Sequence, residues 1–348
     1  MNMKKIALII LVVFALASGS ALQAQEKANM PAWTRYITPT GYFQAGYNTD
    51  QNFNNSFYIK RVRLSVLGTV IDSPKFGKLE YKVQADLANS PKLVDYWLKY
   101  TVCDEFGIQL GQAKTPLSIE NSEYAPLKLE FIDYSLMVQR LCRMSTSDVS
   151  GISATGRELG VQLYGNLVKM SDGHALVRYN LAVYNGNGIN KVDDDKRKDV
   201  MARLMIYPIK DLCLAGYYMR SVGPHSEIVP EYNDYDWYIY DRYGGGLSYD
   251  GKYAWFRAEY MAGHTYGYRA EGAYASVGCK LGSAWGFGLR YDYFNSNTRH
   301  EGFIQNHYSA GLSWRPVKFF RLQLNYTYKM DPGVTPVHFV NLMTSISL

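Results

Sequence analysis

The chain has 348 residues, enough for one large domain or two smaller ones, and its formal charge of +6 is too small and too dispersed to indicate nucleic-acid binding. Mean hydropathy is −0.23, which suits a soluble protein and a transmembrane β-barrel equally, because every second residue of a barrel strand faces water. The 31 tyrosines favour the barrel, since tyrosine suits the membrane–water interface, with a tyrosine-rich soluble β-sandwich or lectin as the alternative.

The N-terminus has the features of a secretory signal peptide over residues 1–24. Lys4 and Lys5 form a basic start, residues 6–17 are an unbroken apolar run, and small residues lead to a cleavage site after Ala24. The run is too short for a helical membrane anchor, the alternative reading, which needs about 20 apolar residues. No cysteine follows the run, which argues against a lipoprotein. We expect residues 25–37 to be a short leader and residues 38–348 to form one barrel domain.

Residues 77–87 show the pattern that recurs along the rest of the chain. Polar and apolar side chains alternate strictly, with Lys78, Glu80, Lys82, Gln84 and Asp86 on one face and Leu79, Tyr81, Val83, Ala85 and Leu87 on the other. A period of two predicts a β-strand with one wet face and one apolar face.

Sixteen such strands are predicted, an even number that is typical of bacterial outer-membrane barrels. They are 38–47, 57–70, 76–88, 92–102, 106–114, 157–168, 175–185, 198–207, 211–221, 240–249, 252–262, 270–280, 284–294, 303–315, 318–329 and 337–348. Most are long enough to cross a bilayer at a tilt, which needs about 9–11 residues. The predicted fold class is therefore all-β, a transmembrane antiparallel β-barrel of 16 strands.

The predicted connections alternate in length, as they do in barrels with short periplasmic turns and long external loops. The long ones are 48–56, 115–156, 186–197, 222–239, 295–302 and 330–336, all odd-numbered. Two connections break the rhythm: 89–91 is odd but short, and 169–174 is even but loose. A soluble meander has no reason to alternate its loop lengths.

Several segments, in this order and spacing, resemble the phosphate-selective porin O and P family. They are FYIKRVRLSVLGTV (57–70), YKVQADL (81–87), DYWLKY (95–100), IQLGQAKTP (108–116), VYNGNGIN (183–190) and KRKDVMARLMIYP (196–208). The resemblance covers nearly the whole chain after the signal peptide. It implies a 16-stranded barrel of a Gram-negative outer membrane, commonly a homotrimer, that passes anions and in some members binds phosphate.

The alternation assigns twelve basic side chains to the lumen, where the residues at the narrowest point select ions. They are Arg61, Arg63, Lys78, Lys82, Lys99, Lys114, Arg178, Arg203, Arg242, Arg257, Arg290 and Arg321. The predicted inward acids are fewer: Glu80, Asp86, Asp95, Glu158, Asp199, Glu259 and Asp292. This excess predicts a lumen that favours anions, with Arg61, Arg63, Lys82, Lys99, Lys114, Arg203, Arg257, Arg290 and Arg321 as pore-lining candidates. The alternative is that these charges simply pair with one another across strands.

The longest connection, 115–156, is the third external loop if the strand count holds, and the resemblance implies that it folds into the barrel and narrows it. Pro126 stands where a first-turn proline would begin a helix, followed by a stripe of Leu127, Phe131, Tyr134, Val138 and Leu141 at helical spacing. The stripe would pack on the inner wall, with Arg140 and Arg143 on the far side as constriction residues. The acidic balance of the segment argues against a simple anion-attracting constriction, and a solvated external cap is the alternative.

No feature predicts an enzyme, a cofactor or a metal site. The six histidines are scattered, and the sequence has no nucleophile elbow, phosphate loop or paired-carboxylate pattern. The acidic runs 193–195 and 233–236 can bind Ca²⁺ or bridge lipopolysaccharide, but such runs are usually solvated loops. We expect the four cysteines to be mostly unpaired.

The sequence predicts an outer-membrane porin, embedded in lipid, that passes small anionic solutes passively, with phosphate or polyphosphate as the specific solute. The alternatives are a plugged barrel that acts as a surface adhesin or receptor through external loops such as 222–239, and an outer-membrane lipase or protease.

Overall fold

The computed structural model describes residues 36–193, 197–224, 237–265 and 267–348. The predicted signal peptide (1–24), most of the leader (25–37), and the acidic runs except Asp193 lie outside these ranges. Sixteen strands are present: β1 (Thr38–Asp50), β2 (Asn55–Ser73), β3 (Gly77–Asp86), β4 (Lys92–Cys103), β5 (Phe106–Lys114), β6 (Arg157–Lys169), β7 (Ala175–Tyr184), β8 (Asp199–Ile209), β9 (Leu212–Pro224), β10 (Trp237–Asp250), β11 (Ala254–Thr265), β12 (Tyr268–Leu281), β13 (Trp285–Asn295), β14 (Ile304–Val317), β15 (Phe320–Met330) and β16 (Val337–Ser347).

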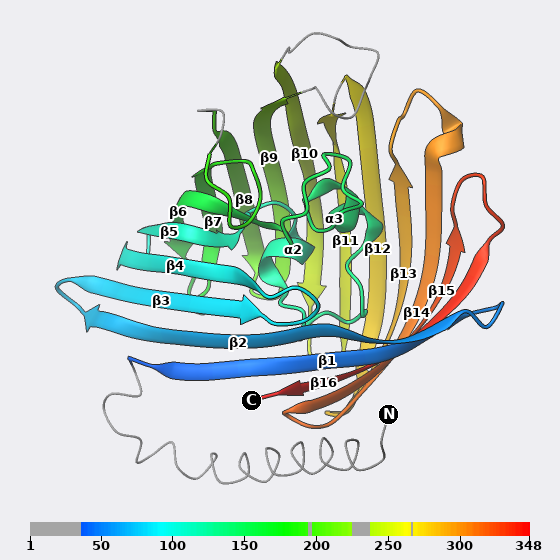
Figure 1. The fold of residues 1–348 in the computed structure, drawn as a ribbon. Helices are drawn as coiled ribbons and strands as arrows, with labels where there is room; N and C mark the ends of the chain where they lie inside the picture. The colour runs from blue at the N-terminus through cyan, green and yellow to red at the C-terminus, as the bar shows by residue number, and fades with distance from the viewer. Residues whose placement is uncertain (1–35, 194–196, 225–236, 266) are drawn as a thin grey trace.

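The strands form one closed antiparallel barrel in which each strand pairs with its neighbours in sequence (Figure 1). β1 closes the ring on β16, in a register that runs from Tyr42 opposite Ser347 to Asp50 opposite Phe339. Closure removes the free edges that an open sheet would present, and this is what allows strands to lie in lipid. The predicted fold class and all sixteen predicted strands are confirmed, with boundaries that differ by a few residues.

Side chains alternate between the two surfaces of the barrel. On β2, Arg63 and Ser65 are buried inside, whereas Leu64 and Val66 are exposed outside. The same alternation appears on β8, where Arg203 is buried and Leu204 is 48% exposed. Polar residues therefore face the lumen, and the outer face carries the apolar side chains that a barrel presents to lipid.

The connections follow the predicted rhythm in most places. Every even-numbered connection is short, and the longest connections, 115–156, 185–198, 225–236 and 296–303, are all odd-numbered. The first connection is an exception, because β1 and β2 extend further than predicted and leave only residues 51–54 between them in place of 48–56. The Asp50 carboxylate accepts hydrogen bonds from the backbone amides of Asn52 and Asn54, and these bonds tighten the turn.

Two short helices occur in the segment 115–156, which we call the inner loop: α2 (Ile119–Glu123) and α3 (Leu136–Leu141). Serine side chains cap both, with Ser118 accepting from Asn121 N and Ser135 accepting from Val138 N. The prediction of a helix that begins at Pro126 is wrong, because the helices lie before and after that residue. Figure 1 shows both helices inside the ring of strands.

The reason for this difference lies in the barrel wall. Between the two helices, apart from one turn in which the Lys128 amide donates to the carbonyl of Ala125, the backbone hydrogen-bonds to wall side chains. Asn325 accepts from the amide of Ile132 at 2.7 Å, and Gln323 donates to the carbonyls of Leu129 and Glu130. These partners satisfy the backbone groups that a helix would otherwise have to pair.

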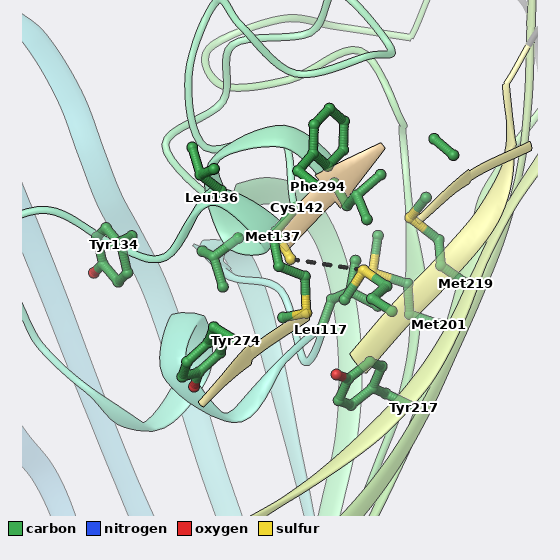
Figure 2. Packing of buried hydrophobic residues seen from close by; sticks show 14 of the residues in the cluster. Leu117, Tyr134, Leu136, Met137, Cys142, Met201, Tyr217, Met219, Tyr274 and Phe294 are labelled. Carbon is green, nitrogen blue, oxygen red and sulfur yellow. Dashed lines mark hydrogen bonds between the residues drawn. The ribbon is translucent and has the colours of Figure 1, made fainter. Parts of the chain in front are cut away.

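An apolar cluster inside the barrel holds the inner loop (Figure 2). From α3 and the following residue, Met137, Val138, Leu141 and Cys142 are each at most 2% exposed. They pack on inward-facing methionines and aromatics of the wall: Met201, Tyr217, Met219, Met261, Tyr274 and Phe294. The barrel therefore encloses a small hydrophobic core on one side of its lumen.

A wall glycine makes room for this packing. At Gly272 on β12, an added Cβ would lie 3.1–3.2 Å from three atoms of Met137. The inner loop therefore approaches the wall more closely there than a larger wall residue would allow.

All four cysteines are free, as expected; Cys103 is exposed and Cys142 and Cys213 are buried. In the described part of the chain, no helix is both long enough and apolar enough to cross a membrane.

Candidate permeation site

Arg143 is the strongest polar link between the inner loop and the wall. Its guanidinium is 3% exposed and donates to Glu158 of β6 at 3.2 Å and to Asp199 of β8 at 2.5 Å. It also donates to the hydroxyls of Ser221 and Tyr240, on β9 and β10. Arg143 therefore contacts the wall, and the prediction that it faces away from the wall is wrong. The apolar stripe does not form one helical face, so its geometry could not place Arg143.

Wall carboxylates hold the inner loop elsewhere. Glu259 of β11 accepts from the amides of Ile119 and Glu120 at 2.6 and 2.9 Å, and Asp292 of β13 accepts from Leu136 N at 3.0 Å. Inside the loop, Glu120 ties α2 to α3 by accepting from the amide and hydroxyl of Ser135.

The Glu120 carboxyl lies in the loop's buried interior, at 2% exposure. Burial raises the pKa of Glu120 to about 7, although the guanidinium groups of Arg290 and Arg257 act in the opposite direction. Burial of this carboxyl on docking of the loop is therefore linked to proton uptake near neutral pH, whereas the hydrogen bonds from Ser135 favour the ionised form.

Three of the four remaining acids of the inner loop are matched by wall cations, whereas Asp148 accepts hydrogen bonds from the Arg143 amide and from Ser150 within the loop. Glu130 pairs with Arg257 at 3.2 Å, Glu123 with Arg203 at 2.7 Å, and Asp133 with Lys60. The acidic balance that the sequence showed for this segment is therefore largely neutralised by wall partners.

Because the inner loop covers the wall from β8 to β15, the open space lies between it and strands β2 to β6. One cavity of about 370 Å³ is lined by Arg63, Lys82, Lys99, Lys114, Arg157 and Arg203, together with Asp95 and Glu123. A second, of about 220 Å³, is lined by Lys60, Arg61, Arg63, Lys92 and Arg157, together with Asp86 and Asp133. Arg63, Arg157 and Pro126 line both cavities, so the two meet at these residues.

We call these two cavities together the passage. Nine basic and four acidic side chains line it, a formal excess of five positive charges. Several of the cations are paired: Arg63 with Asp86 at 3.0 Å, and both Lys82 and Arg157 with Asp95 at 2.6 Å. Within the described residues, Arg61, Lys92, Lys99 and Lys114 have no carboxylate within salt-bridge distance.

The eleven predicted site residues fall into two sets. Arg61, Arg63, Lys82, Lys99, Lys114 and Arg203 line the passage. Arg257, Arg290, Arg321, Arg140 and Arg143 line neither cavity. Arg290 pairs with Asp292 at 2.7 Å, Arg321 donates to the carbonyl of Leu129 at 2.6 Å, and Arg140 donates to the carbonyl of Ser147 within the loop. These five hold the inner loop or are held within it.

Lys60, Lys92 and Arg157 line the passage although strict alternation placed all three on the other face. On β4, Gln84 is opposite Asp95 and Ala85 is opposite Leu93, so Val94 is the extra residue of a β-bulge between Lys92 and Asp95. The pairing of β1 and β2 shifts so that Gln44 is opposite Arg61 and Ala45 is opposite Ile59, which leaves Lys60 as the extra residue of a β-bulge. A bulge turns two successive side chains to one side, so Lys60 and Arg61 both face inward.

Arg157 is the first residue of β6 and follows two residues with positive φ, Thr155 and Gly156. The chain is not yet extended there, so the side-chain alternation of β6 does not apply to Arg157. Only a sequence signal for the two bulges or for the strand start could have placed these three residues.

Residues 40–211, which supply all nine cations of the passage, match the family model described as phosphate-selective porin O and P. This stretch of the chain is similar to that porin family. The resemblance identified from the sequence is confirmed, and no curated protein sequence matches the chain.

Solved porins share the fold at low sequence identity. The anion-selective porin from Comamonas acidovorans is 11% identical, with a TM-score of 0.66 and coverage of 90% of this chain and 99% of that one. OmpF of Salmonella typhi in complex with daunomycin is 10% identical, with a TM-score of 0.64 and coverage of 90% and 97%. OmpT of Vibrio cholerae, solved in a trimer form, is 12% identical, with a TM-score of 0.61 and coverage of 90% and 99%.

The family match and the closed 16-stranded barrel together indicate an outer-membrane porin of a Gram-negative bacterium. They point to a channel and away from an enzyme.

Proposed function

We propose that this porin conducts small anions in preference to cations, by passive diffusion and without a catalytic step. The observation that carries the proposal is the charge of the passage, where nine basic side chains oppose four acidic ones. A narrow, low-dielectric channel concentrates the field of such charges and raises the local concentration of counter-ions. The outward apolar side chains would contact outer-membrane lipid.

Phosphate-like anions are the solutes that we propose for the junction of the two cavities, where Arg63 and Arg157 line both. Arg61 lies beside them, and its guanidinium donates to Gln44 at 2.8 Å and has no carboxylate partner among the described residues. A planar guanidinium donates two parallel hydrogen bonds to paired oxygens, which suits phosphate. This arrangement supports phosphate binding over the passage of chloride alone.

We propose that the protein assembles as a homotrimer. The family resemblance and the fold shared with OmpT, which was solved in a trimer form, support this state. Cross-linking in outer-membrane vesicles tests it, with a species of three chains as the expected product.

The test of ion selectivity is the reversal potential of the purified protein in a planar bilayer across a KCl gradient. The wild type should reverse on the anion side. The triple variant Arg61→Gln, Lys92→Gln, Lys99→Gln removes three cations that have no salt-bridge partner in the described structure, and its anion preference should fall. The matched control Lys75→Gln, Lys252→Gln, Lys318→Gln removes three exposed cations from short connections and should leave selectivity unchanged.

Phosphate added to the same bilayers tests the solute. Phosphate should block chloride current in the wild type at low concentration, and Arg61→Gln should weaken the block. Cation selectivity of the wild type would refute an anion porin, whereas anion selectivity without phosphate block would refute only the phosphate site. A barrel without any conductance would favour the surface-receptor alternative.

A further inference from the structure

A half-buried tryptophan, Trp97, lines the larger cavity of the passage. Trp97 shares the inward face of β4 with Asp95 and Lys99. Its cross-strand partner on β5 is Gly111, whose φ is +118° and where a Cβ would lie 2.8 Å from the Trp97 Cα. Because Gly111 has no side chain, its position directly opposite Trp97 is left free of side-chain atoms. No other aromatic ring or cation of the described residues stacks on the indole.

Hydrogen-bond donors lie around Lys99, two residues after Trp97 on β4. Lys99 is one strand pleat from Trp97, at about 6.8 Å by the rise of an extended chain. Its ammonium lies 4.4 Å from the centre of the Tyr164 ring, on the same wall. Gln109 is the cross-strand partner of Lys99, and Gln162 is the partner of Gln109 on β6.

The Gln162 side chain is oriented by a further contact. The hydroxyl of Tyr184 donates to the Gln162 Oε1 at 3.1 Å. The Gln162 side-chain nitrogen has no acceptor among the described residues, so its N–H groups are available to a solute in the cavity.

The inner loop lines the cavity with four apolar residues beside Ser122 and Glu123, and Glu123 is paired with Arg203. The apolar residues are Ala125, Pro126 and Leu127, with Pro116 at the start of the loop. The volume of about 370 Å³ lies within the range of about 300–1,000 Å³ that small-molecule sites occupy. The cavity thus combines these apolar residues and an indole with a cluster of cationic and amide donors.

We propose that this cavity binds organic anions that carry a single ring. The ring stacks on Trp97 against the apolar edge of the inner loop, while the acid group binds Lys99, Gln109 and Gln162. The proposal builds on the proposed anion selectivity and adds the class of solute. An inorganic anion has no apolar surface to place on Trp97, so a ring should strengthen binding roughly two- to tenfold, the usual contribution of an aromatic pair.

The experiment compares benzoate with acetate as blockers of chloride current in planar bilayers at pH 7.5, where both are fully ionised. In the wild type, benzoate should block at a concentration at least about threefold lower than acetate. Trp97→Leu should remove this difference and keep anion selectivity, whereas Trp97→Phe should keep most of it. Lys99→Gln should weaken block by both anions.

The matched control is Trp285→Leu. Trp285 is 46% exposed on the outer face and stacks on Trp314 at 5.8 Å between ring centres. Its loss should not change the ratio of the two blocking concentrations. Equal block by benzoate and acetate in an anion-selective wild type would overturn the ring-binding inference and leave the proposed anion selectivity standing. A preference for benzoate that survives in Trp97→Leu would have the same consequence. A cation-selective wild type would overturn the proposed function and the inference with it.

Discussion

Arg143 should decide whether the inner loop stays on the wall. In Arg143→Met, the Glu158 and Asp199 carboxylates, which are 0% and 1% exposed, lose their common cation. Removing one partner of a buried ion pair typically costs about 3–5 kcal/mol, because the remaining charge is left uncompensated. The barrel ladder itself is not touched, so we expect the loss to appear as release of the loop.

Cys142, the neighbour of Arg143, provides the assay. It is 2% exposed, and burial raises the pKa of its thiol, so it should react slowly with a maleimide while the loop is docked. Replacing the other three cysteines, Cys103→Ser, Cys213→Ala and Cys279→Ala, leaves Cys142 as the single thiol. In that background Arg143→Met should speed labelling by at least about a hundredfold, which corresponds to the lower end of the cost.

Two control variants separate charge from side-chain volume. The triple variant Arg143→Met, Glu158→Gln, Asp199→Asn removes the stranded charges and should restore slow labelling. Arg140→Met, in which the lost hydrogen bond goes to the carbonyl of Ser147 within the loop, should speed labelling only a fewfold. If Cys142 in Arg143→Met reacts as slowly as in the parent, the ion pairs do not hold the loop and the reasoning fails.

Three other outcomes follow from the described contacts. Gly272→Val should push Met137 off the wall, because even one added carbon would lie 3.1 Å from it. The inner loop would then move toward the passage on the β2 to β6 side and lower single-channel conductance; an unchanged value would be the contrary result. Because the pKa of Glu120 is raised to about 7, its protonated form stabilises docking below the ordinary value of 4.5; that stability is lost as pH rises to about 7. The ratio of Cys142 labelling rates, wild type over Glu120→Gln, should therefore rise roughly tenfold per pH unit between about pH 4.5 and 7 and then level off; a flat ratio would contradict this. Cys103, which is exposed at the end of β4, should react at once in the folded protein, and protection of this thiol would argue against its placement.

The sequence alone determined the barrel. A period of two is a local property of the chain, and the sixteen strands could be read from it because each must present one face to lipid and one to water. The same alternation assigned Arg61, Arg63, Lys82, Lys99, Lys114 and Arg203 to the inner face, and these six residues line the passage. It also predicted that basic residues outnumber acids there.

Only the tertiary structure decided which cations are available to a solute. Arg257, Arg290 and Arg143 are inside the barrel, but the inner loop covers or occupies that side. Carboxylates far from them in sequence, those of Glu130, Glu120 and Asp199 respectively, lie within 4.0 Å of them. Helical periodicity failed at Pro126 because wall side chains bond the backbone of the loop, and alternation failed at Lys60 because of a bulge. These outcomes depend on contacts between residues far apart in sequence, which a local pattern does not contain.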